Sequence, residues 1–331
     1  MKRFLASPFA GPLVALLVVA AAVALTTQRF LDGGNLSNLV LQVSIIAIVA
    51  IGSSFVIFTG GIDLSPGSMI AMLTMVFALG VKMAGLPLGI AVLLVLVLGT
   101  ALGLLNGILT AYLRIPSFIT TLATLSAYRG VAFMFNKGSP IFSLSPHLER
   151  LFYGRVLHVP LPLFYVLVLY AAAFWFLRNT APGRAVYAVG GSANAARLSG
   201  IPVQRVQLLA FVVAGLTASI GAVLMAARLN SGSPNYGVGM ELSAIAAAVI
   251  GGASLAGGRG NIVNTVLGAL TIVIVQNGLN LNAVPTSAQN VVVGAIIVLA
   301  VGIDMWRVEL GEAVRFLSTQ KKGSSPARST T

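Results

Sequence analysis

The chain contains no cysteine, and only 8% of its 331 residues are charged. Without cysteine there is no disulfide, no thiolate nucleophile and no cysteine-ligated metal, and the redox compartment cannot be inferred. Seven carboxylates and two histidines leave little material for metal sites or acid–base catalysis. Soluble globular domains carry roughly a quarter charged residues, so this scarcity of charge excludes a water-soluble domain of this size.

The composition is instead that of a protein whose solvent is the lipid bilayer. Hydrophobic residues make up 57% of the chain, and its mean hydropathy is +0.98. The net charge of +13 would suit a nucleic-acid-binding protein, but most basic residues flank apolar runs. That placement is typical of membrane topology, so we expect membrane lipid and no nucleic acid as a partner.

Apolar segments long enough to cross a bilayer recur along the chain. A spanning helix needs about 20 apolar residues. The candidates are 8–28, 36–58, 64–81, 86–113, 115–136, 159–177, 206–227, 242–258, 261–280 and 287–303. The third is short, and the eighth and tenth are marginal, which allows one or two broken or re-entrant helices. The sequence therefore predicts an all-α integral membrane protein with about ten transmembrane helices.

The two ends of the chain differ from its middle. Lys2 and Arg3 precede the first segment as in a signal peptide, but its length and the spans that follow favour an uncleaved anchor. We expect a single transmembrane domain over residues 1–305. Residues 306–331 should form a polar cytoplasmic tail without fixed structure.

Basic residues predict the orientation in the membrane. With the N-terminus inside and alternating spans, the inner side holds Lys2, Arg3, Arg114, Arg178, Arg184, Arg197, Arg205, Arg259, Arg307, Arg315, Lys321, Lys322 and Arg328. The outer side holds Arg29, Lys82, Lys137, Arg150, Arg155 and Arg228. Because cytoplasmic loops carry the excess of lysine and arginine, we expect both termini and the loop 178–205 inside.

An internal repeat is visible in two short stretches. Residues 105–119, LNGILTAYLRIPSFI, resemble residues 276–288, QNGLNLNAVPTSA. Each has Asn-Gly near the end of one span and a proline before the next. The two copies cross the membrane in opposite directions, which predicts an inverted repeat, an architecture typical of transporters.

Residues 60–72, GGIDLSPGSMIAM, contain one of the few carboxylates, Asp63. Ser65 and Pro66 have the form of an N-cap and a first-turn proline opening a helix. Two interpretations stay open here. The segment is either a turn at the membrane surface with Asp63 solvated or capping, or a broken helix whose polar turn lies within the protein.

Other polar residues within spans carry the same ambiguity. Arg129 is a functional candidate, but its position near the end of a span favours snorkelling to the outer interface. Gln276, Asn277 and Asn280 lie at helical spacing, and Asn106 lies in the fourth span. Amides suit a neutral, hydroxyl-rich solute, but they also hydrogen-bond between helices. Glu241 is interpreted as an interfacial cap.

Glycine is abundant, with 36 residues, and favours close packing of helices rather than chemistry. Gly99, Gly103 and Gly107 have the small-xxx-small spacing of tightly packed membrane helices. The stretch GGASLAGGRG at 251–260 lacks the G-x-x-x-x-G-K-[ST] pattern of nucleotide-binding loops, which occurs nowhere in the chain. We therefore expect no catalytic residue, no metal and no cofactor.

The inner loop reads RAVYAVGGSANAARLSGIP over residues 184–202. Gly190 and Gly191 are expected to break the chain, and 192–198 to form two helical turns. Ala195 and Ala196 would then face a close partner, and Pro202 would prevent a longer helix. The alternative is a surface loop without a partner.

These motifs resemble the permease subunits of bacterial carbohydrate ABC importers, of the ribose, galactose and xylose type. The resemblance rests on 60–72, on IPSFITTLATLSAYRG at 115–130, on YAVGGSANAARLSGIPV at 187–203, and on 239–270 followed by NGLN at 277–280. It covers most of the chain. It implies a multi-pass protein of the bacterial inner membrane that imports a simple sugar, a pentose or a hexose.

The resemblance also implies partners and site residues. A second permease copy or a sister permease completes the path, a cytoplasmic ABC ATPase hydrolyses ATP, and a periplasmic sugar-binding protein delivers the solute. The residues expected to couple to the ATPase are Arg184, Gly190, Gly191, Asn194, Ala195, Ala196, Arg197, Ser199 and Gly200. The substrate path is expected to include Asp63, Asn106, Gln276, Asn277 and Asn280. Such permeases often have an acidic residue after Gly-Gly-Asn, where this chain has Ser192, Ala193 and Asn194.

Three alternative functions differ in what they require of the chain. A branched-chain amino-acid permease of the same superfamily would need helix termini or charges to bind a zwitterion. A membrane-embedded enzyme would need paired carboxylates or a metal cluster, but Asp63, Glu149, Glu241 and Asp304 fall in separate segments. An ion-coupled secondary transporter would need no ATPase.

Overall fold

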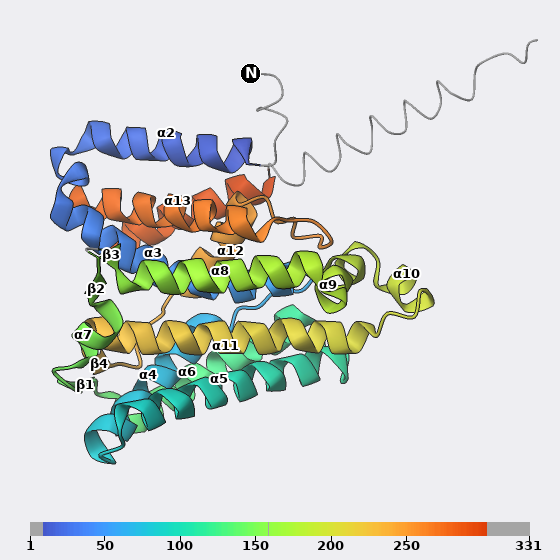
Figure 1. Ribbon diagram of the computed structural model, residues 1–331, viewed down its shortest axis with the longest axis horizontal. Coiled ribbons are helices and arrows are strands. Elements are labelled where there is room, and N and C mark those ends of the chain that lie inside the picture. The colour runs from blue at the N-terminus through green and yellow to red at the C-terminus, as the bar shows by residue number, and fades with distance from the viewer. Residues whose placement is uncertain (1–8, 158, 303–331) are drawn as a thin grey trace, which may run out of the picture.

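The computed structural model describes residues 9–157 and 159–302 and consists almost wholly of helices (Figure 1). In chain order the elements are α2 (Ala10–Thr26), the 3₁₀-helix η1 (Gln28–Leu31), α3 (Gly33–Phe58), α4 (Pro66–Ala78), the π-helical turn η2 (Leu79–Met83), α5 (Leu88–Ala111), α6 (Ser117–Met134), the 3₁₀-helix η3 (Phe135–Gly138), β1 (Ile141–Phe142), α7 (Leu148–Tyr153), β2 (Arg155–Val156), β3 (Val159–Pro160), α8 (Leu161–Asn179), α9 (Ala181–Gly191), α10 (Ala193–Leu198), α11 (Val203–Leu229), β4 (Ser231–Gly232), α12 (Met240–Ile250), α13 (Ile262–Leu281) and a last helix over Thr286–Gly302. The predicted tail 306–331 and both chain ends lie outside the described residues.

The prediction of an all-α membrane protein is confirmed. Seven helices of the described residues are long and apolar enough to cross a membrane, and α2, α12 and Thr286–Gly302 are shorter apolar helices. Each of the ten predicted segments overlaps one of these ten helices. At about 1.5 Å per residue, the 11 residues of α12 are too short to span a bilayer core of about 30 Å. The eighth segment is therefore a broken one.

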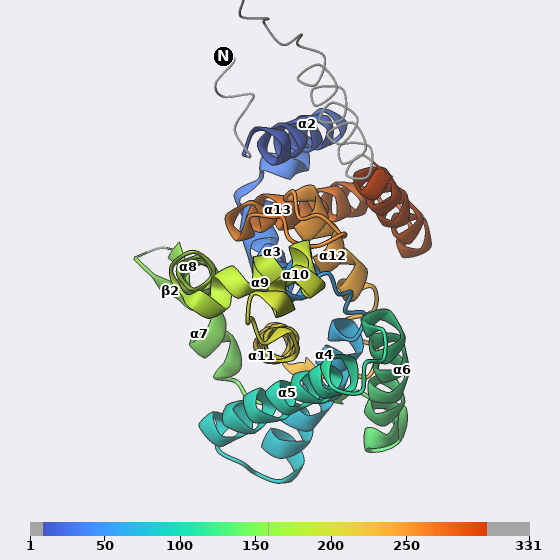
Figure 2. The same ribbon diagram turned by 90° about the vertical axis from the view of Figure 1, so that its right-hand side faces the viewer.

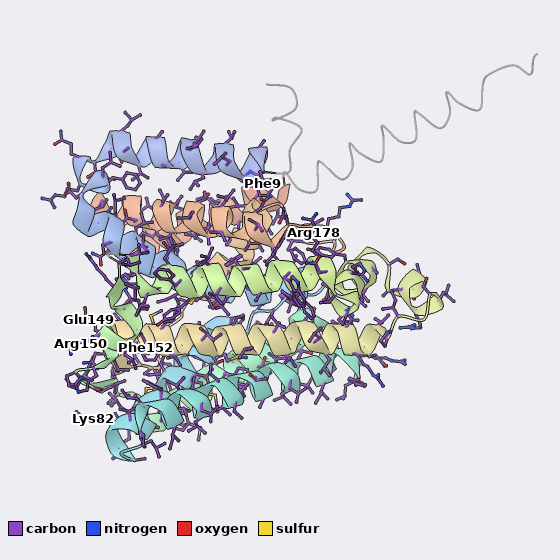
Figure 3. The ribbon with its side chains drawn as sticks, viewed as in Figure 1. Phe9, Lys82, Glu149, Arg150, Phe152 and Arg178 are labelled. Carbon is purple, nitrogen blue, oxygen red and sulfur yellow. The ribbon has the colours of Figure 1, made fainter. Side chains whose placement is uncertain are left out.

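The helices lie side by side, and their connections gather at two ends of the bundle (Figure 1). One end carries Lys82, Glu149 and Arg150, and Arg178 lies toward the other (Figure 3). The two-stranded sheets β1–β4 and β2–β3 are antiparallel. We call the end that carries α9 and α10 the coupling end; Figure 2 looks onto it.

Two long helices, α3 and α11, form the centre of the bundle. A methyl group added at Gly52 of α3 would overlap Thr217 and Ala214 of α11, so the two backbones are in close contact. On the other side of α11, Gly103 of α5 faces Gly215, and a methyl group on Gly103 would lie 2.8 Å from the Gly215 Cα. The predicted packing role of the α5 glycines is confirmed.

The inverted repeat has a structural basis. Helices α3, α4, α5 and α6 correspond to α11, α12, α13 and the last helix. In each half the first helix is followed by an extended break and a short helix, and α5 packs on α11 as α13 packs on α3. Pro116 and Pro285 each stand directly before a helix, and their turns lie at opposite ends of the bundle (Figure 1).

Candidate functional site

Two short helices begin inside the bundle rather than at its ends. The break between α3 and α4 buries its polar residues, since Asp63 is only 3% exposed and Ser65 is fully buried. Asp63 Oδ1 accepts hydrogen bonds from the backbone N of Ser65 (2.9 Å) and from its Oγ (2.7 Å). Of the two interpretations of 60–72, the structure shows the broken helix with its polar turn within the protein.

The break between α11 and α12 reaches the same place from the other end. Gly237 (φ +70°) and Gly239 (φ +75°) adopt left-handed backbone conformations that favour glycine. The stretch that contains these two glycines places Glu241, in the first turn of α12, against Gly67, in the first turn of α4. A methyl group on Gly67 would overlap the Glu241 carboxylate and the Gly237 carbonyl. The N-termini of α4 and α12 therefore meet inside the bundle.

Arg129 of α6 fixes the break that precedes α12. Its Nη1 donates to the carbonyl oxygens of Pro234 (2.6 Å) and Tyr236 (2.7 Å). The snorkelling interpretation is wrong, because the loop carbonyls hold the guanidinium within the protein. Glu241 is not an interfacial cap either. One of its carboxylate oxygens is buried without a hydrogen-bond partner among the described residues, and it lies within electrostatic range of Arg129 and Asp63.

A chain of hydrogen bonds joins the first break to α5 and α6. Asn106 is fully buried, and its Nδ2 donates to the Ser65 Oγ over 2.9 Å. The Tyr128 hydroxyl donates to the Asn106 Oδ1 at 3.3 Å and to the Leu102 carbonyl at 3.2 Å. The structure thus brings together two predicted path residues, Asp63 and Asn106, through Ser65.

The amides of α13 bind three different helices. Gln276 Nε2 donates to the Oγ of Ser243, near the start of α12, at 3.3 Å. Asn277 exchanges two hydrogen bonds with Asn35 of α3, at 2.8 and 3.0 Å. The Asn280 Oδ1 accepts from Gln289 Nε2 at 2.8 Å. Gln276 therefore belongs with the two breaks, whereas Asn277 and Asn280 form pairs of their own.

Sequence reasoning missed several of the polar residues around the two breaks. Residues 61–65 read GIDLS and residues 239–243 read GMELS, so Asp63 corresponds to Glu241 and Ser65 to Ser243. In each half an amide of the long helix bonds to this serine, Asn106 to Ser65 and Gln276 to Ser243, although the repeat aligns Asn106 with Asn277. This five-residue match was the signal that would have identified Ser65, Ser243 and Glu241.

The predicted coupling loop is a pair of short helices at the coupling end (Figure 2). Gly190 and Gly191 do not break the chain as expected; they are the last residues of α9, and the break falls at Ser192. The Ser192 hydroxyl accepts from the Ala195 backbone N at 3.2 Å and caps α10. The predicted helical turns over 192–198 are confirmed.

Exposure within α9 and α10 corrects part of the predicted coupling set. Ala196 is only 4% exposed and packs against the chain itself, so it cannot face a partner. The exposed members are Arg184, Gly191, Asn194, Ala195, Arg197, Ser199 and Gly200. Sequence reasoning missed Leu198, whose side chain is 90% exposed between Arg197 and Ser199.

Within the described residues there is no group of three or more histidines or carboxylates that could hold a metal ion. Apolar helices of membrane-spanning length, an inverted repeat and two half-helices that meet inside the bundle define a membrane transport protein. The class follows from the broken helices at the repeat interface.

The chain belongs to the family described as "Branched-chain amino acid transport system / permease component", whose sequence signature matches residues 35–301. It is 41% identical over 298 residues to the ribose import permease protein RbsC of Escherichia coli (strain K12), covering 88% of this chain and 92% of that protein. The RbsC of Bacillus subtilis (strain 168) is 38% identical over 296 residues, covering 89% and 92%.

A relative with a different name is similar over nearly the same range. The xylose transport system permease protein XylH of Escherichia coli (strain K12) is 34% identical over 340 residues, covering 84% of this chain and 86% of that protein. No solved structure matches the chain. Family membership makes the chain a multi-pass transport component of a permease system and not an enzyme, as predicted.

Proposed function

We propose that this permease subunit imports a simple sugar, a pentose or a hexose, across the bacterial inner membrane in an ATP-driven importer. The observation that carries the proposal is the similarity over most of the chain to permeases named for ribose and xylose. The family description names branched-chain amino acids, but these relatives favour a sugar as the solute.

The centre of the bundle supports a path for a neutral solute. The first turns of α4 and α12 meet there, at the interface of the two repeats, where transporters with broken helices bind their substrates. The Asp63 carboxylate accepts two hydrogen bonds from Ser65, and the Arg129 guanidinium donates to two loop carbonyls. Of the predicted path residues, Asp63 lies in the first break, Asn106 is bonded to that break through Ser65, and Gln276 is bonded to the start of α12 through Ser243. Asn277 and Asn280 form hydrogen bonds elsewhere.

The exposed segment α9–α10 supports docking of a separate ATPase. Since the chain carries no nucleotide-binding loop, hydrolysis is assigned to a cytoplasmic partner and no cofactor to this chain. Leu198, Ala195 and Arg197 offer an apolar and basic surface at the coupling end. The remaining proposed partners are a periplasmic sugar-binding protein and a second permease copy or sister permease.

The proposed inward-facing coupling end depends on the basic residues at the two ends of the chain. Basic residues among the described ones divide evenly, six at the coupling end (Arg114, Arg178, Arg184, Arg197, Arg205, Arg259) and six at the other (Arg29, Lys82, Lys137, Arg150, Arg155, Arg228). The described carboxylates in the connections, Asp32 and Glu149, both lie at the second end. The excess of basic residues expected inside therefore rests on residues 1–8 and 303–331, which lie outside the described residues.

Uptake of labelled solutes tests the proposal. A strain lacking the chain is compared with the same strain expressing it, together with its ATPase and binding protein. We expect accumulation of a labelled pentose or hexose that stops when cellular ATP is depleted. Accumulation of leucine without any sugar would favour the amino-acid alternative. Sugar uptake that survives ATP depletion and stops with a proton uncoupler would favour a secondary transporter.

A further inference from the structure

Three glycine-bearing segments meet at the coupling end, from parts of the chain far apart in sequence. They are Gly60–Gly61 after α3, Gly190–Gly191 at the end of α9, and Gly257–Gly260 in the connection from α12 to α13. The backbone N of Gly258 donates to the Phe58 carbonyl over 3.0 Å. A methyl group on Gly190 would overlap both of these atoms. We call this contact the glycine junction.

The glycine junction is a contact between backbones. A methyl group on Gly257 would lie 2.8 Å from the Gly60 Cα and 2.9 Å from the Gly190 carbonyl oxygen. One on Gly258 would lie 2.6 Å from the Gly191 Cα. Gly60, Gly257 and Gly258 also have φ values of +81°, +84° and +70°, which favour glycine. Backbone atoms in close contact cannot make room for each other by a change of side-chain rotamer. Displacement of one segment therefore displaces the others.

An aromatic pair reinforces the glycine junction beside the backbone contacts. The ring of Tyr187 on α9 stacks on the ring of Phe58 at the end of α3, with 5.0 Å between centroids and 28° between planes. Phe58 is fully buried, and Gly260 lies against the same ring. Burial raises the pKa of the Tyr187 hydroxyl to about 12.

Two of the three segments of the glycine junction lead to a half-helix, one in each half of the repeat. Two residues after Gly61 the chain reaches Asp63, and α4 begins at Pro66. The intervening Ile62 is fixed to α6, because its backbone N donates to the Ser117 Oγ (3.0 Å). The connection that holds Gly257–Gly260 starts where α12 ends. A movement of α9 therefore reaches the start of one half-helix and the end of the other.

We infer that Gly190, Gly258 and the Phe58–Tyr187 pair are positioning residues that transmit movement of α9–α10 to both half-helices at once. The inference rests on the proposed docking of an ATPase on α9–α10 and adds the route from there to the centre of the bundle. It assigns a role to the stretch 251–260, which is rich in glycine but lacks the G-x-x-x-x-G-K-[ST] pattern of a nucleotide-binding loop.

The ratio of sugar imported to ATP hydrolysed tests this route. The permease, its ATPase and its binding protein are assembled in vesicles, and both rates are measured per assembled complex. Gly190→Ala should retain the ATPase but lower the ratio about tenfold, within the range typical of coupling between two sites. Gly89→Ala at the start of α5, outside the glycine junction and the coupling segment, should leave the ratio unchanged, because a methyl group there meets no atom within 4 Å. Gly130→Ala in α6, also without neighbours, controls for a helical glycine.

A second pair of variants decides the question if Gly190→Ala does not fold. Tyr187→Ala removes the ring stack without adding atoms and should also lower the ratio, whereas Tyr187→Phe keeps the ring and should restore it. An unchanged ratio in Tyr187→Ala, or in a folded Gly190→Ala, overturns the inference. If substitutions at Ala195 and Leu198 leave ATPase binding intact, the proposed docking fails instead, so the two failures are distinguishable.

Discussion

The side chain of Asn106 donates a hydrogen bond of 2.9 Å from its Nδ2 to the Oγ of Ser65, joining α5 to the break before α4. In the other half of the repeat Gln276, next to the residue that aligns with Asn106, donates a similar bond to Ser243, at 3.3 Å. Each bond ties the first turn of a half-helix to a long neighbouring helix. Each half-helix is therefore held by one neutral amide, at the place where the two halves meet.

Replacing Asn106 with leucine should lower sugar transport several-fold per assembled complex. The change leaves the Tyr128 hydroxyl and the Ser65 Oγ with one partner fewer, and losing such a bond costs about 0.5–1.5 kcal/mol. Uptake in vesicles and thermal melting in detergent measure the two effects. Thr100→Val on the same helix removes only a local bond to Leu96 and serves as the control. Unchanged uptake with a lower melting temperature would leave Asn106 a packing residue.

The reciprocal pair of Asn35 and Asn277 separates packing from a role in the path. Asn277→Leu should destabilise the protein by about 1–3 kcal/mol, because it removes both hydrogen bonds to the half-buried Asn35. The double variant Asn35→Leu/Asn277→Leu should recover most of the lost stability, since both partners are then apolar. If transport stays low in the stable double variant, Asn277 contacts the solute; if transport recovers with stability, it does not.

Arg129 and Glu241 should depend on each other. Arg129→Met leaves two loop carbonyls without their donor and Glu241 without its nearby positive charge. We expect a loss of stability, because each hydrogen bond from a charged group contributes about 1.5–3 kcal/mol. Adding Glu241→Gln should restore part of the stability in thermal melts. No recovery in the double variant would mean that the carbonyl bonds alone account for the loss.

Apolar length alone predicted most of this fold. A run of uncharged residues must be a helix at membrane depth, because only a helix satisfies its own backbone there. The sequence predicted the exact positions of the helix breaks less well. Pro66 marks the start of α4 by its fixed φ, but nothing comparable marks Met240, where α12 begins after two left-handed glycines.

The candidate site was predictable only where a local motif defined it. The helical turns of α10 follow from Ser192 and the alanines after it. The burial of Ala196 and the exposure of Leu198 do not, because they depend on which face of α10 meets the rest of the chain. The same holds for Arg129, since its partners Pro234 and Tyr236 lie more than a hundred residues away.

Cysteine labelling checks the orientation in the membrane. The chain has no cysteine, so Arg150→Cys and Thr330→Cys each introduce a single thiol. We expect an impermeant thiol reagent to label the first in intact cells and to reach the second only after the membrane is permeabilised. The reason is that Arg150 lies at the end opposite α9–α10 (Figure 3). Labelling of Thr330→Cys together with protection of Arg150→Cys would reverse the proposed orientation.

Docking of the ATPase on α10 is tested at Leu198, with a matched leucine at the opposite end of the bundle. Leu198→Asp places a charge on a side chain that is 90% exposed, where it should block the partner without disturbing the fold. Leu157→Asp makes the same change at a position 89% exposed and should have no effect on ATPase binding.

Ala195→Trp adds bulk on the exposed face of α10 and should act like Leu198→Asp, whereas Ala196→Trp should unfold the segment because Ala196 is buried. Copurification of the ATPase with each variant, at equal amounts of permease in the membrane, is the measurement. Full ATPase recovery and sugar-stimulated hydrolysis with both Leu198→Asp and Ala195→Trp would show that the partner docks elsewhere. Equal loss with Leu157→Asp would point to a general effect of charge, because that residue lies at the far end of the chain's helices from α10.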